Sequence, residues 1–433
     1  MGRGENILAK ATDHPEAYAI FATCGTWAAS AISWRARLPA TRIPEGKTIM
    51  MRANLIPRSE FDARMNKVKQ ALAQRGMDVG IVTSAENIFY LTGLDHQGYF
   101  GPHALAVRPD GEALLFARAH EQTTVNRQVE NSRFVGYPDT ASPGAFIAEH
   151  LKSMGLGDAT IGIQVESLGF PPAFDAAVRA GLPAVQWSDI SGLVERFRLV
   201  KSKNEVFAIR KAAAVSDACM ETALSVAKVG INEQVIAAEV HKRMFEIGGE
   251  YVGFGPFIRS GERLPYEHEV WTDRVIGEGE QLFVEMAGCV GRYHAPMGRL
   301  AFAGKAPAGT HELAEICIAA QGRVLEAMRP GATGADAYNA WQSVIDEAGL
   351  AHYRRHHCGY AVGIAFPPTW TGGIGVVSMH PESDLVLECN MVFHQLSWLL
   401  GCGRGDYFVS DTVLVGESGG ERLTTAARDV VIL

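Results

Sequence analysis

The order of helical and strand-like segments in the second half of the chain limits its fold more than any other feature. Two consecutive helical patterns, His311–Met328 and Gly334–Ala348, separate a strand-like run at Gln281–Met286 from two later runs at Met391–Leu396 and Tyr407–Val415. Helices therefore do not alternate with strands as they do in a doubly wound parallel sheet. The pattern predicts an α+β fold with an antiparallel sheet.

A smaller α/β unit precedes this half. Ser59 is placed to cap a helix that Gly76 ends. Strand-like runs at His103–Val107 and Glu112–Ala117 flank a Pro-Asp-Gly turn, which is typical of a hairpin. These signals predict an N-terminal domain with its own sheet.

The chain length favours more than one domain, because 433 residues exceed the usual size of a single one. A capping box, Ser202-x-x-Glu205, precedes an apolar stripe at helical spacing and begins the first helix of the larger domain. We expect a poorly ordered extension at residues 1–53, a small domain at 54–190 and a catalytic domain at 191–433.

Charge and cysteine usage limit which partners the protein is expected to bind and in which cellular compartment it is expected to reside. Lys and Arg number 40 against 48 Asp and Glu, the net charge is -8, and no basic stripe occurs, so nucleic acid is not an expected partner. The 7 cysteines form no C-x-x-C pair, which disfavours structural zinc and a disulfide framework. An uncharged stretch at residues 17–34 lacks the positive start of a signal peptide. These features predict a cytoplasmic protein that does not associate with a membrane.

Several common active-site motifs are missing: there is no Walker loop, dinucleotide fingerprint or H-E-x-x-H. Histidine, aromatic and proline residues instead concentrate in the second half, interleaved with glycines at strand ends, which is how concave sites are built. The segments run over residues 260–268, 283–299, 354–370 and 391–394.

The order of these segments resembles the pita-bread superfamily, which contains methionine aminopeptidase, prolidase, Xaa-Pro aminopeptidase, creatinase and ectoine hydrolase. The resemblance extends from Arg58 to Leu423 and includes the linker at residues 196–205 and the closing segment that begins at Asp411. It implies a creatinase-type N-terminal domain and a pita-bread catalytic domain. It also implies a homodimer in which the small domain reaches the partner's site, with Phe100 at that edge.

Peptidases of the superfamily hold two divalent metals with two Asp, one His and two Glu, because hard oxygen ligands must bridge the cations. The corresponding positions here are Glu285, Pro296, Tyr360, Leu396 and Ser410. One carboxylate cannot hold a bridged pair, and Asp411 points to the opposite strand face from Ser410. The resemblance therefore implies no metal and no other cofactor.

The ectoine hydrolase and creatinase branch resembles this chain most. The shared marks are Glu285-Met-Ala-Gly, Arg292-Tyr-His-Ala-Pro296, the run from Gly359 to Trp370, and Met391-Val-Phe-His394, together with the interval from Ser260-Gly261 to His268. This branch implies a metal-independent hydrolase that cleaves a non-peptide C–N bond in a small cyclic amidine or cationic compatible solute.

The resemblance assigns Glu285 as the nucleophile or the base for a water, His268 as the acid and Tyr360 as a third catalytic residue. The implied substrate-binding residues are Phe100, His294, Trp370, His394 and Arg299. Trp370 would supply a stacking surface for a flat cation.

Three alternatives stay open. Glu285 could form a structural ion pair with Arg292 or Arg299 instead of acting chemically. A metal-dependent dipeptidase or Xaa-Pro aminopeptidase could use a mononuclear site rebuilt from Glu285, His394 and Asp406. The chain could also be a binding module without activity, because fold alone does not settle function.

Overall fold

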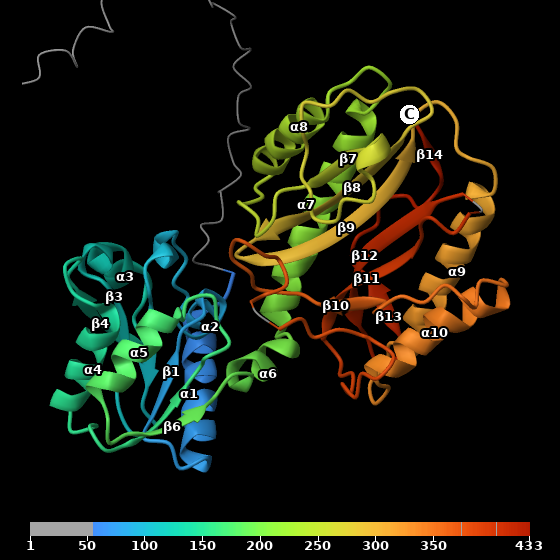
Figure 1. Ribbon diagram of the computed structural model, residues 1–433. Coiled ribbons are helices and arrows are strands. Elements are labelled where there is room, and N and C mark those ends of the chain that lie inside the picture. The colour runs from blue at the N-terminus through green and yellow to red at the C-terminus, as the bar shows by residue number, and fades with distance from the viewer. Residues whose placement is uncertain (1–54, 374, 404) are drawn as a thin grey trace, which may run out of the picture. The chain divides into compact units, whose positions relative to one another are not determined.

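The computed structural model describes residues 55–373, 375–403 and 405–433 (Figure 1). The predicted extension at residues 1–53 lies outside the described residues. In the part of the chain that the structure describes, no helix is both long and apolar enough to cross a membrane.

The N-terminal domain contains a six-stranded mixed sheet in the order β4-β3-β2-β1-β5-β6. β1–β2 and β2–β3 pair antiparallel, whereas the other neighbouring pairs are parallel. The strands are β1 (Val79–Val82), β2 (Ala104–Val107), β3 (Ala113–Arg118), β4 (Ser132–Tyr137), β5 (Thr160–Ile163) and β6 (Gln186–Asp189). The helices are α1 (Arg58–Gln74), α2 (Ala85–Thr92), α3 (Gln122–Gln128), α4 (Pro143–Ser153), α5 (Pro172–Gly181) and α6 (Leu193–Leu199).

Two local predictions for this domain have different outcomes. The hairpin is confirmed, because β2 pairs with β3 directly. The prediction that Ser59 caps the first helix is wrong: α1 begins at Arg58, and Pro57 is the N-cap residue, with an extended backbone at φ -67° and ψ 151°. Proline favours this boundary because its fixed φ suits the residue before a helix and its missing N–H costs nothing there.

The catalytic domain begins its first long helix as predicted. Ser202 Oγ accepts a bond from Glu205 N at 3.2 Å, and Glu205 Oε2 accepts one from Ser202 N at 2.9 Å. The helices are α7 (Lys203–Val226), α8 (Glu233–Glu246), α9 (Thr310–Ala327) and α10 (Gly334–Glu347). The strands are β7 (Phe257–Ser260), β8 (Gln281–Val290), β9 (Tyr293–Phe302), β10 (Gly359–Ala361), β11 (Val392–Leu399), β12 (Tyr407–Val415), β13 (Gly420–Arg422) and β14 (Val431–Ile432).

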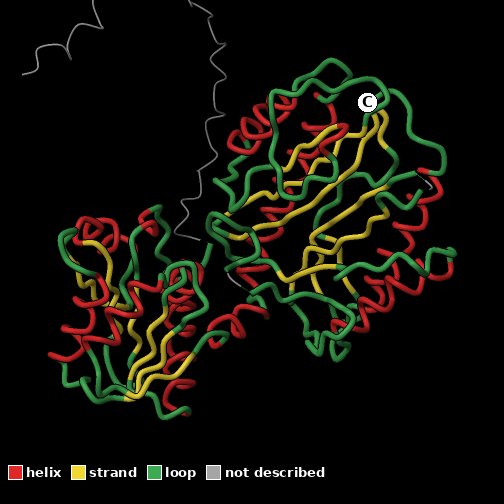
Figure 2. Tube along the Cα trace, in the orientation of Figure 1, coloured by secondary structure: helices red, strands yellow, loops and turns green. Residues whose placement is uncertain are grey.

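These strands form one curled sheet in the order β10-β11-β12-β9-β8-β7, with β13 beside β12 and β14 beside β9 (Figure 2). Every pair along the main path is antiparallel, which confirms the predicted α+β class. Long strands hold the sheet together, since β8 and β9 pair over 10 residues each.

The four helices of this domain cover one face of the sheet. α7 packs on β8 and β9, and α9 packs on β11 and β12 (Figure 1). Ser216 of α7 bonds to Gly288 N and Ala295 O, and Gln321 of α9 bonds to Asp411. Glu285 and Ser410 differ in strand parity from Gly288 and Asp411, so they lie on the opposite face, which the helices leave open.

Candidate active site

One row of side chains crosses the open face of the sheet. Glu285 of β8 pairs with Gly298 of β9, Gly298 pairs with Ser410 of β12, and Ser410 pairs with Leu396 of β11. A Cβ atom at Gly298 would lie 3.1 Å from Ser410 Oγ and 3.2 Å from Glu285 Cβ. A ring carbon of Phe408 lies closer still, at 2.5 Å, so the missing side chain allows this ring to pack between Glu285 and Ser410.

A chain of hydrogen bonds runs beside this row. Trp370 Nε1 donates to Tyr360 Oη at 2.9 Å, Tyr360 Oη lies 2.8 Å from His394 Nδ1, and His394 Nε2 lies 2.8 Å from Ser410 Oγ. Because an indole N–H can only donate, Tyr360 accepts that bond and has its own proton free for His394 Nδ1. We therefore assign the neutral His394 proton to Nε2, from which it donates to Ser410.

Burial keeps the members of this chain uncharged. It lowers the pKa of His394 to about 3 and raises the pKa of Tyr360 above its usual value, with the Glu285 charge adding to the second effect. Tyr360 and His394 thus act as hydrogen-bond donors and acceptors in their neutral forms. Tyr360, at the position where the resemblance expects a metal-binding histidine, supplies a phenol to the site.

Glu285 has neither of the arginine partners that a structural role requires. Arg292 pairs with Glu250 and Arg299 pairs with Asp411, whereas the nearest histidine nitrogen to Glu285, His394 Nε2, is 3.7 Å away. Burial raises the pKa of Glu285 to about 8, partly offset by Arg259. Its side chain still exposes 13% of its surface, so the carboxyl group is within reach of a ligand.

Aromatic rings surround Glu285 and link it to His268. Phe257 lies directly opposite Glu285 in the β7–β8 pair, and its ring centroid is 5.7 Å from that of His268. Phe254 stacks on His268 at 6.5 Å and meets Trp370 edge-on at 4.9 Å. The exposed His268 therefore lies at the rim of the same site, on a residue with φ 61°.

The structure brings Glu285, His268, Tyr360, Trp370 and His394 together. Of the other predicted residues, His294 has both ring nitrogens engaged by the backbone, at Arg292 O and at Gly253 N. Phe100 lies in the N-terminal domain, 79% exposed, with its ring 5.3 Å from Arg118.

Arg299 is directed toward the helix-covered side of the sheet. It donates to Asp411 and to four carbonyl oxygens, those of Gly298, Ser410, Ala426 and Ala427. These bonds join β9 to β12 and to the C-terminal segment.

The metal-binding chemistry of the superfamily does not fit this donor set. Proline and leucine offer no ligand atom, and the remaining positions present one carboxyl group, one phenol and one hydroxyl. Within residues 55–373, 375–403 and 405–433, no group of three or more His, Cys, Asp or Glu is placed to hold a metal ion. Asp406, the third ligand of the rebuilt-site alternative, instead accepts bonds from Gln281 Nε2 and Gly401 N.

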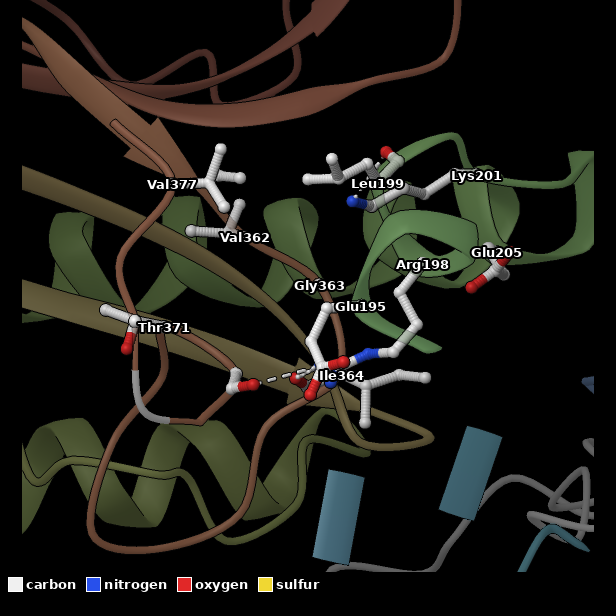
Figure 3. Close-up of a pocket in the computed structure, with 13 residues that line it drawn as sticks. Glu195, Arg198, Leu199, Lys201, Glu205, Val362, Gly363, Ile364, Thr371 and Val377 are labelled. Atoms are coloured by element: carbon white, nitrogen blue, oxygen red, sulfur yellow. Dashed lines mark hydrogen bonds between the residues drawn. The ribbon is translucent and has the colours of Figure 1, made fainter. Parts of the chain in front are cut away.

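A small cavity of about 50 Å³ lies elsewhere, between α6 and the loop after β10 (Figure 3). Arg198 donates to Asn87 Oδ1, Ile364 O and Gly372 O there, and Lys201 donates to Leu199 O. The volume suits one or two waters, and its charged groups tie neighbouring segments together. We therefore attach no catalytic role to this cavity.

Sequence reasoning missed three contributors to the site. Ser410 was noted only as a lost carboxylate, although it ends the hydrogen-bond chain. Arg259 and Phe257 lie on β7, on the same face as Glu285, two and four residues before the Gly261 of the His268 motif. Strand alternation before Ser260-Gly261 could have indicated them, but only with the β7–β8 register known.

Comparison with known proteins agrees with this architecture. Residues 64–200 match the creatinase/prolidase N-terminal domain, and residues 208–417 match metallopeptidase family M24. An uncharacterized hydrolase/peptidase of Sinorhizobium fredii, y4tM, is 30% identical, with 86% of this chain and 97% of that protein covered. The ectoine hydrolase of Halomonas elongata is 26% identical over 87% of this chain and 98% of its own length.

Among solved structures, the Xaa-Pro dipeptidase from Bacillus anthracis is 21% identical, with a TM-score of 0.75 over 86% of this chain and 100% of the other. This likeness concerns the fold. Together with the matched domains and the 30% identical relative, it confirms the resemblance to the pita-bread superfamily. The chain belongs to metallopeptidase family M24, a family of hydrolases, and carries a creatinase/prolidase-type N-terminal domain.

Proposed function

We propose that this protein is a metal-independent hydrolase of a non-peptide C–N bond in a small cyclic amidine or cationic compatible solute, similar to ectoine hydrolase. The observation that carries the proposal is the environment of Glu285: a ligand-accessible carboxyl group opposite the Phe257 ring, 3.7 Å from a His394 nitrogen and with no arginine ion pair among the described residues. The similarity to the ectoine hydrolase of Halomonas elongata supports the substrate class.

The chemistry follows from an amidinium carbon that carries two nitrogens. Glu285 attacks this carbon, or deprotonates a water that attacks it, and the carbon becomes tetrahedral. One C–N bond then breaks as His268 at the rim donates a proton to the departing nitrogen. In the covalent route a water then attacks the glutamyl intermediate and breaks its bond to Glu285, which restores the carboxylate. By either route the net reaction adds one water and yields an amide and a free amine. A nucleophile must be ionised, and a cationic ring beside Glu285 would lower its raised pKa on binding.

The neutral hydrogen-bond chain orients the site during this reaction. Tyr360 accepts from Trp370 and donates to His394, so the direction of its hydroxyl group is fixed. Ser410, held by His394, lies across Gly298 from Glu285. Such preorganised dipoles stabilise developing charge without the cost of reorienting water.

A substrate screen tests the proposal. Purified enzyme is incubated with ectoine, hydroxyectoine, creatine and Gly-Pro, with and without EDTA, and products are quantified by chromatography. We expect turnover of a cyclic amidine that EDTA does not change, and elemental analysis without stoichiometric divalent metal. Hydrolysis of Gly-Pro that EDTA abolishes would contradict the proposal and favour the metal-dependent peptidase.

A further inference from the structure

Arg259 is a buried arginine with fewer partners than its burial requires. Only 3% of the residue is exposed, yet its Nε has no hydrogen-bond partner among the described residues. Its Nη1 donates to Tyr266 O, and the nearest carboxylate oxygen, on Glu267, is 3.9 Å from Nη1 and belongs to a side chain that is 74% exposed. Removing a guanidinium from water without satisfying its donors costs stability, so the group is expected to have a function.

Arg299 provides an internal comparison on the same sheet. It is buried to a similar degree, and its Nε, Nη1 and Nη2 all donate, with Asp411 as its ion-pair partner. Arg292 is also fully buried, and although its Nη1 lacks a hydrogen-bond partner, a carboxylate oxygen of Glu250 lies 2.8 Å from its Nη2. Arg259 differs from both, because among the described residues no carboxylate oxygen lies closer to it than 3.9 Å. The missing anion indicates a partner that is not part of the protein.

Arg259 lies beside Glu285, which indicates that its missing partner is a ligand of the Glu285 site. Arg259 lies opposite Phe283 in the β7–β8 pair, and Phe257 lies opposite Glu285, so Arg259 and Glu285 are diagonal neighbours on the open face. Such neighbours are separated by about 7–8 Å. The Arg259 guanidinium stacks on Phe283 at 4.4 Å, and this stacking fixes the plane of its remaining donors. A small molecule on this face of the sheet can therefore contact the Glu285 carboxyl group with one end and the Arg259 guanidinium with the other.

We infer that Arg259 is a substrate-binding residue that takes a carboxylate carried by the substrate of the Glu285 site. A guanidinium presents paired donors that match the two oxygens of a carboxylate. The ligand class is then a small zwitterion, with its cationic ring at Glu285 and its carboxylate at Arg259. This inference rests on the proposed function for the ring, whereas the carboxylate contact stands on Arg259 itself.

Calorimetric binding of two probes tests the inference. Ectoine, which carries a carboxylate, and its carboxamide are titrated into Glu285→Gln protein, in which turnover does not interfere, with and without Arg259→Gln. We expect Arg259→Gln to weaken ectoine binding by about 10–100-fold, the usual cost of losing a charged hydrogen-bond pair. Binding of the carboxamide should be unchanged.

Further variants keep the result interpretable. Arg259→Lys keeps the positive charge but lacks the paired N–H donors of the guanidinium, so it should give an intermediate loss of ectoine affinity. It also provides a second variant in case the glutamine variant misfolds. Arg323→Gln changes an exposed arginine of α9 and should have no effect on either probe. Arg355→Gln removes the other guanidinium near the site, which stacks on Trp398 and also has an unpartnered Nε.

The outcomes are distinct. Equal losses for both probes, a loss confined to Arg355→Gln, or equal binding of both probes before any change at Arg259 would overturn the assignment. Failure of the proposed function has a different signature: no product from ectoine with the unmodified enzyme, while the carboxylate-dependent loss at Arg259→Gln persists.

Discussion

Glu285 combines two properties that rarely coexist in a carboxylate. It lies among apolar strand residues and rings, and this burial raises its pKa to about 8 although the Arg259 charge partly offsets the rise; no arginine of the described residues forms an ion pair with it. Folding therefore costs more when Glu285 is ionised than when it is protonated. A chain has no structural reason to keep such a residue, which favours a chemical role.

Glu285→Gln separates the chemical role from a structural one. The amide keeps the shape but has no nucleophilicity, so turnover should fall about 10³-fold or more while substrate binding and the fold persist. His268→Ala should also be slow, and the double variant should be far less impaired than the product of the single losses. Steady-state kinetics and thermal melts measure both quantities. A drop in melting temperature with unchanged kcat would remove Glu285 from the mechanism.

The pH dependence has a defined sign. The usual pKa of a glutamate is 4.5, and burial raises that of Glu285 to about 8, so the acidic limb of the kcat/KM profile should rise with pH up to about 8 as the carboxylate forms. Stability should move the other way. Between pH 4.5 and about 8 the unfolded chain has lost this proton and the folded chain retains it, so the free energy of unfolding falls as pH rises.

Glu285→Gln should abolish this contribution to the pH dependence. Denaturant titrations at pH 5 and pH 9 measure the free energy of unfolding of both proteins. The value for the variant minus the value for the unmodified protein should be more positive at pH 9 than at pH 5. A kcat/KM that is flat from pH 6 to 9 would contradict the raised pKa.

At the scale of elements, the antiparallel sheet decides which side chains meet. β8, β9, β12 and β11 place Glu285, Gly298, Ser410 and Leu396 in one row although their segments are far apart in sequence. The sequence predicted β12 with its observed ends and α7 with its capping box, because alternation and capping are local signals. The contacts of Arg259 and Ser410 could not be predicted, because they depend on registers between strands that only the folded sheet defines.

Gly298→Ala tests the row of side chains that crosses the open face of the sheet. The added Cβ would lie 2.5 Å from a ring carbon of Phe408 and 3.2 Å from Glu285 Cβ, so it crowds the floor of the site. We expect a loss of about 1–3 kcal/mol in the free energy of unfolding and a lower kcat/KM. Gly322→Ala is the matched control, because nothing lies within 4 Å of a Cβ there and the position is inside α9. It should raise stability by about 0.5–1 kcal/mol without changing kcat/KM.

At the scale of the whole molecule, one exposed ring needs an explanation. Phe100 is 79% exposed, whereas its neighbour Tyr99 packs against His96 and His103 at centroid distances of 4.8 and 4.6 Å. The short helix Gly98–Phe100 therefore leaves an apolar ring in solvent, with the Arg118 guanidinium against it. Surface aromatics held in this way are characteristic of interfaces. The predicted homodimer, in which Phe100 forms a wall of the partner's site, would give the ring a role.

Subunit mixing tests this prediction more sharply than mass alone. If each site combines Glu285 of one chain with Phe100 of the other, the Glu285→Gln and Phe100→Asp proteins should each have low activity by themselves. A mixed dimer of the two variants would contain one intact site. Random assortment makes half of the dimers mixed, so refolding the two variants together should recover about a quarter of full activity. Light scattering should report a dimer throughout, and Leu168→Asp, at another exposed apolar residue, should leave activity unchanged. If Phe100 acted only within its own chain, each subunit of the mixed dimer would carry one of the two substitutions and no site would be intact. Activity after mixing would then stay at the average of the two variants.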